Sequence, residues 1–327
     1  MKNLLNAIST YRTALMGIAI IGVMIGHCKG EWPVTIFSKL VGVFCFSVFT
    51  GGFLFLSGFG LFFSMSKNPN VDDFYRKRVK RLLVPWLCLA VPYFLLMDIV
   101  QAGKWNAFLW HVSTLSFWKS GNYSGMWYIS VIVMLYLLYP WYHRFAFRGG
   151  TYRNGMVLLT ISGIAFVEYL LFTIWPDLYG RLEIAMSISI FFIGVYVGYL
   201  SALRNLFSYA LIIESGGVIL LNLILVIFTL LNNHIFILYN IASVFAWAWL
   251  FSSIHNKKIG NSSIRVVEWF GRYTLELYMI HLFLYYIMKN VLLPGVSNNM
   301  LFPIAVVVAL AVCKPIHDAI DKLIKAI

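Results

Sequence analysis

The sequence contains little charge for its size. Asp, Glu, Lys and Arg make up 11% of the 327 residues, whereas apolar residues make up 61%. This excludes a soluble globular protein, which needs far more polar surface. The chain also lacks low-complexity stretches, visible internal repeats and long linkers rich in Pro, Gly or Ser. We therefore expect an integral membrane protein whose residues 1–327 form a single domain.

Cysteine is scarce, and its spacing excludes the usual metal sites. The four cysteines lie singly in or beside apolar runs, without a C-x-x-C pair. We interpret them as small hydrophobic residues and expect no metal. A cleavable signal is also lacking, because the first apolar run, from Ala14 to His27, has no small-residue cleavage site. We expect this run to remain as the first membrane span.

Long apolar runs, by contrast, are frequent. They fall near residues 12–29, 40–64, 82–100, 126–143, 156–175, 184–200, 208–231, 234–253, 272–290 and 300–316. Since a helix needs about 20 residues to cross a bilayer, the sequence predicts an all-α, polytopic transmembrane bundle of about ten spans. Placing the N-terminus inside leaves six of the 25 Lys and Arg residues outside, namely Lys29, Lys39, Lys104, Lys119, Arg181 and Lys289. Both termini are therefore predicted to be cytoplasmic.

The net charge of +13 does not indicate a nucleic-acid partner. Such a partner needs a continuous basic face, whereas these charges lie between hydrophobic runs. The membrane potential and anionic lipid head groups explain them better. The longest external segment, 101–125, carries Trp105, Trp110, His111 and Trp118. This mixture suits a helix or loop that lies in the membrane interface.

His27 is the first ionisable residue that hydrocarbon tolerates poorly. It follows Arg12 by 15 residues, about 22 Å along a helix, so we place it in the outer half of the span. An imidazole can act as the general base of an acyl transfer; the alternative is an interfacial, hydrogen-bonded histidine. Gly22 and Gly26 form a G-x-x-x-G step, which serves internal packing as readily as a homo-oligomer contact.

The densest charge cluster spans residues 76–81, where five of six residues are positive. One interpretation is topological, since such a cluster keeps a loop inside and touches anionic head groups. The other is a phosphate-rich cytoplasmic ligand such as coenzyme A. If the third helix begins before the cluster, Arg78 and Arg81 share a helical face and can grip one phosphorylated ligand. Arg76 is the third candidate for this binding.

Four further candidates lie in later spans. Trp127 and Tyr128 begin the fourth span, where an aromatic belt is the alternative to a functional role. Glu276 and His281 lie five residues apart in the ninth span, about 140° around the helix, so they are poor direct partners and either could instead meet another helix. Any of three glutamates could orient His27, and the sequence does not choose among them: Glu168, Glu183 and Glu214.

Taken in chain order, these segments resemble the acyltransferase-3 family of bacterial membrane O-acyltransferases. The run that ends at His27 is similar to the family's first span, which ends in a histidine held to be essential. Four later segments match family motifs in the same order: Phe53–Phe59, Phe74–Pro85, Met126–Ile129 and Gly271–His281. One departure is Met16, where the family often has an arginine. Arg12, one turn earlier and about 40° from the same face, is the nearest substitute.

The resemblance implies an enzyme of the bacterial cytoplasmic membrane. It would move an acyl group, usually acetyl, from cytoplasmic acyl-CoA to a hydroxyl of an extracytoplasmic glycan or lipid-linked saccharide. His27 would be catalytic, either as a base or as a covalent acyl carrier. The coenzyme would bind to Arg76, Arg78 and Arg81, and the supporting residues would be Arg12, Trp127, Tyr128, Glu276 and His281. The alternatives are a saccharide-lipid transporter or flippase, which would not bind coenzyme A, and a structural or sensory membrane protein.

Overall fold

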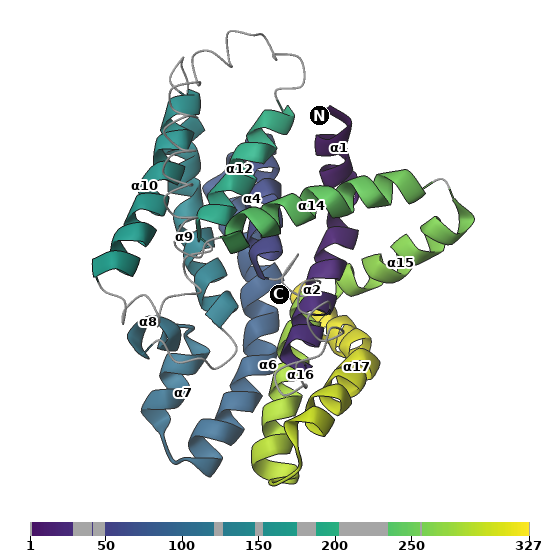
Figure 1. Cartoon of the computed structure of the whole chain (residues 1–327). Coiled ribbons are helices and arrows are strands. Elements are labelled where there is room, and N and C mark those ends of the chain that lie inside the picture. The colour runs from purple at the N-terminus through teal and green to yellow at the C-terminus, as the bar shows by residue number, and fades with distance from the viewer. Residues whose placement is uncertain are drawn as a thin grey trace.

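A computed structural model describes residues 2–28, 41, 50–120, 127–147, 153–174, 188–202, 235–255 and 257–326. Within these ranges the fold is all-α, as the sequence predicted (Figure 1). The α-helices are α1 (Lys2–Thr10), α2 (Arg12–Cys28), α4 (Thr50–Lys67), α5 (Val71–Arg78), α6 (Val84–Phe94), α7 (Trp105–Val112), α8 (Ser116–Ser120), α9 (Trp127–Phe147), α10 (Arg153–Ile174), α12 (Ile188–Ala202), α14 (Ile235–Ile254), α15 (Lys258–Arg272), α16 (Thr274–Ile287) and α17 (Asn298–Ala326).

The predicted apolar runs are helical as far as the structure describes them, except that Tyr273 forms a turn between α15 and α16 within the run 272–290. The run 208–231 lies outside the described residues. The sequence treated residues 254–271 as a connection and ended the last run at residue 316. The structure differs at both places, because α15 fills the connection and α17 continues to Ala326. Both additions are amphipathic helices rather than uniformly apolar ones, so hydropathy alone does not separate them from loops.

Two continuous helices in the described ranges are long and apolar enough to cross a bilayer, Val71–Gln101 and Asn298–Ala326. At about 1.5 Å per residue they measure about 46 and 44 Å, which exceeds the roughly 30 Å of a hydrocarbon core. Three described apolar helices are shorter: Arg12–Cys28, Ile188–Ala202 and Asn240–Ile254. The count of about ten spans and the cytoplasmic termini remain predictions.

The first of these long helices widens at the basic cluster. Pro85 has no N–H to donate to the carbonyl of Arg81, so an α-helical ladder is interrupted there. The chain accommodates the gap with the π-helical segment η2 (Val79–Leu83), closed by a bond from the Val84 N–H to the Val79 carbonyl. Because α5 already begins at Val71, the basic cluster is helical, which is the condition for Arg78 and Arg81 to share a face.

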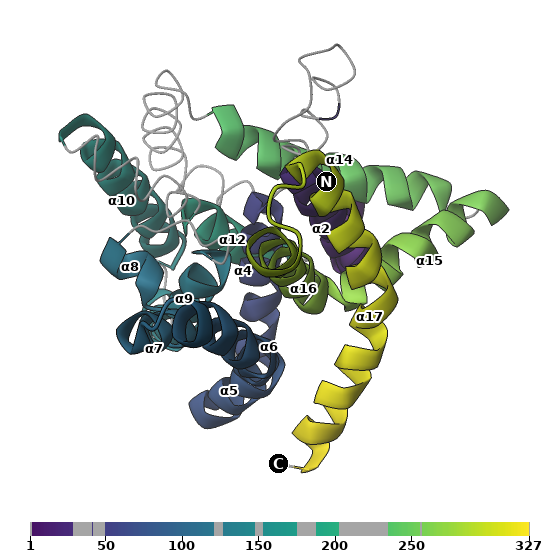
Figure 2. The ribbon, with the colours of Figure 1, turned by 90° about the horizontal axis from the view of Figure 1, so that it is seen from below.

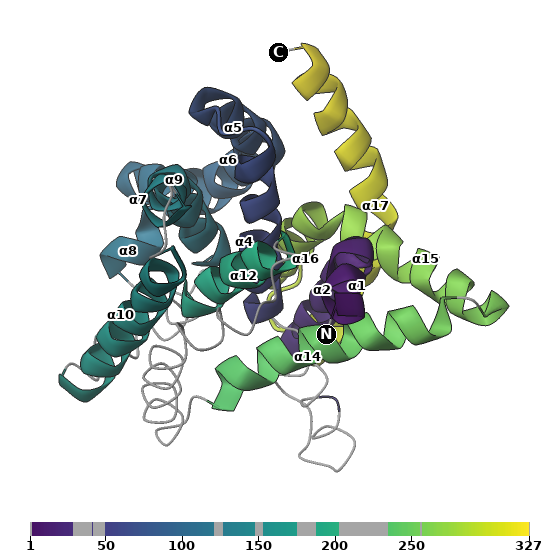
Figure 3. The ribbon, with the colours of Figure 1, turned by 90° about the horizontal axis from the view of Figure 1, so that it is seen from above.

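The views from three sides place α2, α4 and α16 in the interior of the bundle. In Figure 1, α9, α10 and α12 lie on one side of α4, α15 and α17 lie on the other side of α2, and α14 crosses both α4 and α2. Among the described helices the most extensive contacts are α4 with α12 and α2 with α15. The C-terminal end of α17 projects away from the other helices (Figures 2 and 3).

The predicted interfacial segment forms two short helices, α7 and α8, at the end of the bundle opposite the N-terminus (Figure 1). The side chain of Trp105 is 63% exposed, as an interfacial location requires. Two hydrogen bonds fix α7 to the helix before it: the Trp86 indole donates to the Val112 carbonyl at 2.9 Å, and His111 Nδ1 lies 2.7 Å from Asp98 Oδ2. The segment is therefore docked on the bundle and exposes tryptophan outward.

Candidate active site

A cavity of about 420 Å³ lies where α2, α4, η2, α9, α16 and α17 meet. This volume is in the range of small-molecule binding sites. Cationic side chains from three parts of the chain line it: Arg12, Arg78, Lys80, Arg81 and Arg272. The cavity therefore has the size and the charge of a site for an anionic ligand.

Arg78 is the most constrained of these cations. Its guanidinium donates to the Ser64 hydroxyl at 3.3 Å and lies over the rings of Phe74 and Tyr136, at 5.3 and 5.6 Å. Its Nε is buried and has no hydrogen-bond partner within the protein. A buried donor without a partner costs free energy. An anion in the cavity would satisfy it, so this atom independently indicates a ligand.

Arg12 reaches the same cavity from α2. Its Nε donates to the Leu56 carbonyl of α4 at 3.1 Å, and its guanidinium lies flat against Gly60, where a Cβ atom would come within 2.6 Å of it. Met16, which occupies the position where the family often has an arginine, lines the cavity as well. The side chains at positions 12 and 16 thus reach the same cavity.

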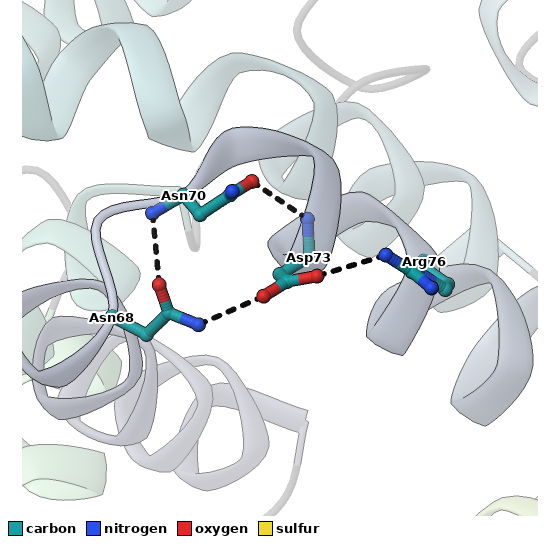
Figure 4. A network of polar contacts seen from close by, with 4 residues as sticks. All are labelled: Asn68, Asn70, Asp73 and Arg76. Atoms are coloured by element: carbon teal, nitrogen blue, oxygen red, sulfur yellow. Dashed lines mark hydrogen bonds and ion pairs between the residues drawn. The ribbon is translucent and has the colours of Figure 1, made fainter.

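Arg76 lies apart from the other two arginines named by the sequence. It is not among the residues that line the cavity, and it pairs with Asp73 at 2.9 Å, with 68% of its side chain exposed. Figure 4 shows why: Asp73 also accepts from Asn68 at 3.0 Å, while Asn70 caps the first turn of α5 through the Asp73 N–H. Arg76 therefore belongs to the capping network of α5.

His27 and His281 form a direct pair. His27 Nδ1 lies 2.9 Å from His281 Nε2, and the two rings stack with centroids 5.2 Å apart. His281 is completely buried, and its Nδ1 bonds to the carbonyl oxygen of Leu277, one turn earlier in α16. Neither histidine lines the cavity. The sequence named both residues and did not connect them.

None of the glutamates considered for orienting His27 is placed by the structure. Glu183 and Glu214 lie outside the described residues, as does the side chain of Glu168. The residue that contacts His27 is His281, 254 residues away in the sequence. No periodicity within one helix could have indicated this pair.

Glu276 meets another helix, as its position allowed. Its carboxylate accepts from His317 Nδ1 at 2.7 Å, and His317 Nε2 lies 3.6 Å from Asp321 of the same helix. All three residues line the cavity that the arginines also line. Sequence reasoning missed His317 and Asp321 because it ended the last apolar run at residue 316. Their spacing of four residues beside the apolar Ile320 and Ile324 is the helical signal that could have found them.

Trp127 and Tyr128 have different environments. Trp127 is buried at the start of α9, while Tyr128 lines the cavity. The Tyr128 ring packs edge-on against Tyr278 with centroids 5.8 Å apart, and Tyr278 packs edge-on against His281 at 6.4 Å. Because Tyr278 lines the cavity too, it separates the cationic cavity from the histidine pair.

The described part of the chain contains no group of three side chains suited to hold a metal ion. The structure brings together a cationic cavity and the hydrogen-bonded group of Glu276, His317 and Asp321 that lines it. The pair of His27 and His281 lies beyond the ring of Tyr278. In a bundle of apolar helices this combination is typical of a membrane enzyme with an anionic substrate. The reaction class of the protein is indicated by its similarity to a known family.

A family model described as an acyltransferase domain matches residues 13–317, nearly the whole chain. The chain belongs to the acyltransferase-3 family, which confirms the resemblance found in the sequence. Members of this family are membrane proteins, and the two long apolar helices agree with that location. Comparison with curated proteins and with solved structures gives no significant match.

Proposed function

We propose that the protein is a membrane O-acyltransferase that moves an acyl group, most simply acetyl, from cytoplasmic acyl-CoA to a hydroxyl of an extracytoplasmic glycan or lipid-linked saccharide. The observation that carries the proposal is the convergence of five cationic side chains on one ligand-sized cavity in an acyltransferase. Coenzyme A is an acyl donor with several phosphate groups. Guanidinium groups bind phosphate through paired, charge-assisted hydrogen bonds.

In this mechanism Arg78 and Arg81 hold the phosphates at the cytoplasmic end, with Arg12 deeper in the cavity. The pantetheine arm extends past Tyr128 and Tyr278 toward His27. The distance to cover is about 22 Å, the length of helix between Arg12 and His27 at 1.5 Å per residue. The donor therefore enters from the side that contains acyl-CoA, and its thioester reaches the outer half of the bundle.

His27 acts as the general base. Its ring takes the proton of the acceptor hydroxyl while the hydroxyl oxygen attacks the carbonyl carbon of the thioester. The C–O bond forms, the C–S bond breaks, and the imidazolium returns the proton to the sulfur to give an ester and free coenzyme A. The runner-up route first places the acyl group on His27 and then transfers it to the acceptor.

The supporting residues have separate roles. The Tyr128 hydroxyl donates a hydrogen bond to the oxyanion that develops on the thioester carbonyl, and buried Trp127 holds Tyr128 in place from the start of α9. Glu276, tied to His317, fixes a wall of the cavity that the arginines also line. His281 supports His27. The cavity and the histidine pair both come from one chain, so the mechanism does not depend on a homo-oligomer.

The proposed setting is the bacterial cytoplasmic membrane. About ten spans, with both termini inside, would place the basic cluster beside cytoplasmic acyl-CoA and anionic lipids and His27 toward the outer side. The whole chain, residues 1–327, would act as one domain. A saccharide-lipid transporter or flippase could use a similar polar interior, but it would have no reason to bind coenzyme A.

Inverted membrane vesicles from producing cells test the function, because they expose the cytoplasmic face and carry the native acceptor. Acetyl-CoA labelled in its acetyl group is added, and ester-linked label on vesicle saccharides is measured. Wild-type vesicles should transfer label, and His27→Ala vesicles should bind acetyl-CoA without transfer. His143→Ala is the matched control, because His143 lies in a separate aromatic cluster with Phe62 and Phe147.

Two results would contradict the proposal. A wild-type protein that does not bind acetyl-CoA would favour the transporter class. Transfer at the normal rate by His27→Ala would remove the assigned mechanism. If transfer is observed, the acceptor can be identified by comparing surface glycans from cells with and without the gene for a lost ester-linked acyl group.

A further inference from the structure

The contacts of His281 form a hydrogen-bonded chain with a fixed direction. The chain runs from the Leu277 carbonyl oxygen to His281 Nδ1, through the ring to His281 Nε2, and on to His27 Nδ1. A carbonyl oxygen can only accept a hydrogen bond. The proton of His281 therefore lies on Nδ1, pointing at Leu277.

The charge of His281 determines which ring donates the proton in the hydrogen bond between His281 and His27. Its ring is completely buried, and among the described residues no carboxylate lies within ion-pair distance of either histidine. A buried imidazolium without a counter-charge is costly, so His281 is neutral. A neutral ring with its proton on Nδ1 has a bare Nε2, which can only accept. The proton in the bond between the two rings consequently belongs to His27 Nδ1.

His27 also has no carboxylate partner among the described residues, so its ring is neutral as well, and its single proton on Nδ1 leaves Nε2 bare. Which ring nitrogen of a histidine carries the proton is set by the hydrogen bond that the other nitrogen makes. His27 also lies close to two nearly parallel rings, with centroids 5.2 Å from the His281 ring and 6.2 Å from the Phe302 ring. Phe302 in turn stacks on Tyr285 at 3.6 Å. Both the tautomer and the ring plane of His27 are thus fixed by its neighbours.

We infer that His281 is a positioning residue that holds His27 in the tautomer with its proton on Nδ1 and leaves Nε2 as the base for the acceptor hydroxyl. The role of Nε2 as base rests on the proposed function, whereas the tautomer does not. Without His281, the His27 proton can move to Nε2, and that nitrogen can no longer accept the proton of the acceptor.

Three variants separate this role from simple packing. His281→Phe keeps a buried ring and removes the acceptor. His281→Gln keeps an amide oxygen that can accept from His27 Nδ1 and an amide N–H that can reach Leu277. His143→Phe makes the same change at a half-buried histidine outside the site, where the nearest polar contact is Ser66 at 3.5 Å.

In the inverted-vesicle assay, His281→Phe should lower kcat about 100-fold, the typical loss when acid–base catalysis fails. The KM for acetyl-CoA should not change, because His281 does not line the cavity. His281→Gln should recover most of kcat, and His143→Phe should match the wild type. A parallel change in kcat and KM, no rescue by Gln or an unchanged kcat in His281→Phe would overturn the inference.

A second measurement does not depend on activity. Nitrogen NMR of the purified protein with labelled histidines distinguishes protonated from bare ring nitrogens, and His27→Ala assigns the resonances. We expect wild-type His27 to have a bare Nε2 and a protonated Nδ1, and His281→Phe to lose this preference. A proton on Nε2 in the wild type would overturn the inference. A bare Nε2 in a protein that transfers no acyl group would uphold the tautomer and overturn only the proposed function.

Discussion

Gly271 of α15 faces the carbonyl oxygen of Thr13 in α2 so closely that a Cβ atom on Gly271 would lie 1.8 Å from that oxygen. One turn away the arrangement is reversed, since a Cβ atom on Gly17 would lie 1.9 Å from the carbonyl oxygen of Val267. The two helices therefore meet backbone to backbone, which only glycine allows. This contact holds Arg272, the next residue of α15, at the wall of the cavity.

Gly271→Ala should separate α15 from α2. We expect a loss of about 1–3 kcal/mol in the free energy of unfolding, typical of overpacking, and a higher KM for acetyl-CoA because Arg272 is displaced. Thermal unfolding of the purified protein and the vesicle assay measure the two effects. Gly163→Ala in α10 is the control, because nothing lies within 4 Å of its Cβ position. Equal melting temperatures for both variants would contradict the prediction.

The all-α architecture could be predicted because apolar runs of helical length are a local property of the sequence. The helix α15 could not be predicted from hydropathy, since Arg265 and Glu268 interrupt its apolar residues. Its most extensive contact is with α2, and it also contacts α14 and α16. The C-terminal end of α17, beyond residue 316, was not predicted because it too is amphipathic. Helical periodicity, rather than mean hydropathy, is the sequence signal for such amphipathic helices.

The residues of the candidate site show the same distinction between what local sequence predicts and what tertiary packing brings together. Arg78 and Arg81 could be found because they are close in sequence and their helix sets their spacing. The partners of His27 and Glu276 could not, because His281 and His317 reach them through tertiary packing. Arg76 has the same charge as Arg78 and lies two residues before it, but Asp73 in the first turn of α5 engages its side chain outside the cavity, as Figure 4 shows.

Arg78→Gln and Arg81→Gln should each raise the KM for acetyl-CoA with little change in kcat. A hydrogen bond to a charged group contributes about 1.5–3 kcal/mol, which corresponds to about a 10- to 100-fold increase. We expect Arg76→Gln to have a much smaller effect because it lies outside the cavity. Lys77→Gln removes one charge from the same cluster at an exposed position and controls for net charge.

A uniform effect of all four substitutions on the KM for acetyl-CoA would contradict this prediction. It would mean that the cluster acts through its summed field rather than through two positioned guanidinium groups. Repeating the measurement at higher salt strengthens the comparison, since screening weakens a general field more than a direct contact within the cavity.

His317→Ala should destabilise the packing of α17 on α16. The substitution leaves the Glu276 side chain, which is 5% exposed, without its hydrogen-bond partner at 2.7 Å, and leaving a buried polar group unpaired typically costs about 1–3 kcal/mol. Because His317 is partly exposed, we expect the lower end of this range. Adding Glu276→Gln should recover part of the loss by removing the stranded charge.

Thermal unfolding of the two single variants and the double variant checks this coupling. Asp318→Ala is the matched control, since Asp318 is exposed and does not line the cavity. Additive losses in the double variant would show that the Glu276 and His317 side chains do not stabilise the protein through their contact.

The orientation of the helix Val71–Gln101 is the prediction on which the route of the acyl donor depends. Lys77 lies near its start, and Lys104 lies just past its end in an exposed turn before α7. The 25 residues from 77 to 101 span about 36 Å of helix, enough to cross a hydrocarbon core of about 30 Å. Lys77→Cys and Lys104→Cys, each in a background without the native cysteines, should therefore react with a membrane-impermeant maleimide from opposite sides. Right-side-out vesicles should label position 104 and inverted vesicles position 77. The reverse pattern would place Arg78 and Arg81 away from cytoplasmic acyl-CoA, and labelling of both positions from one side would show that this helix does not cross the membrane.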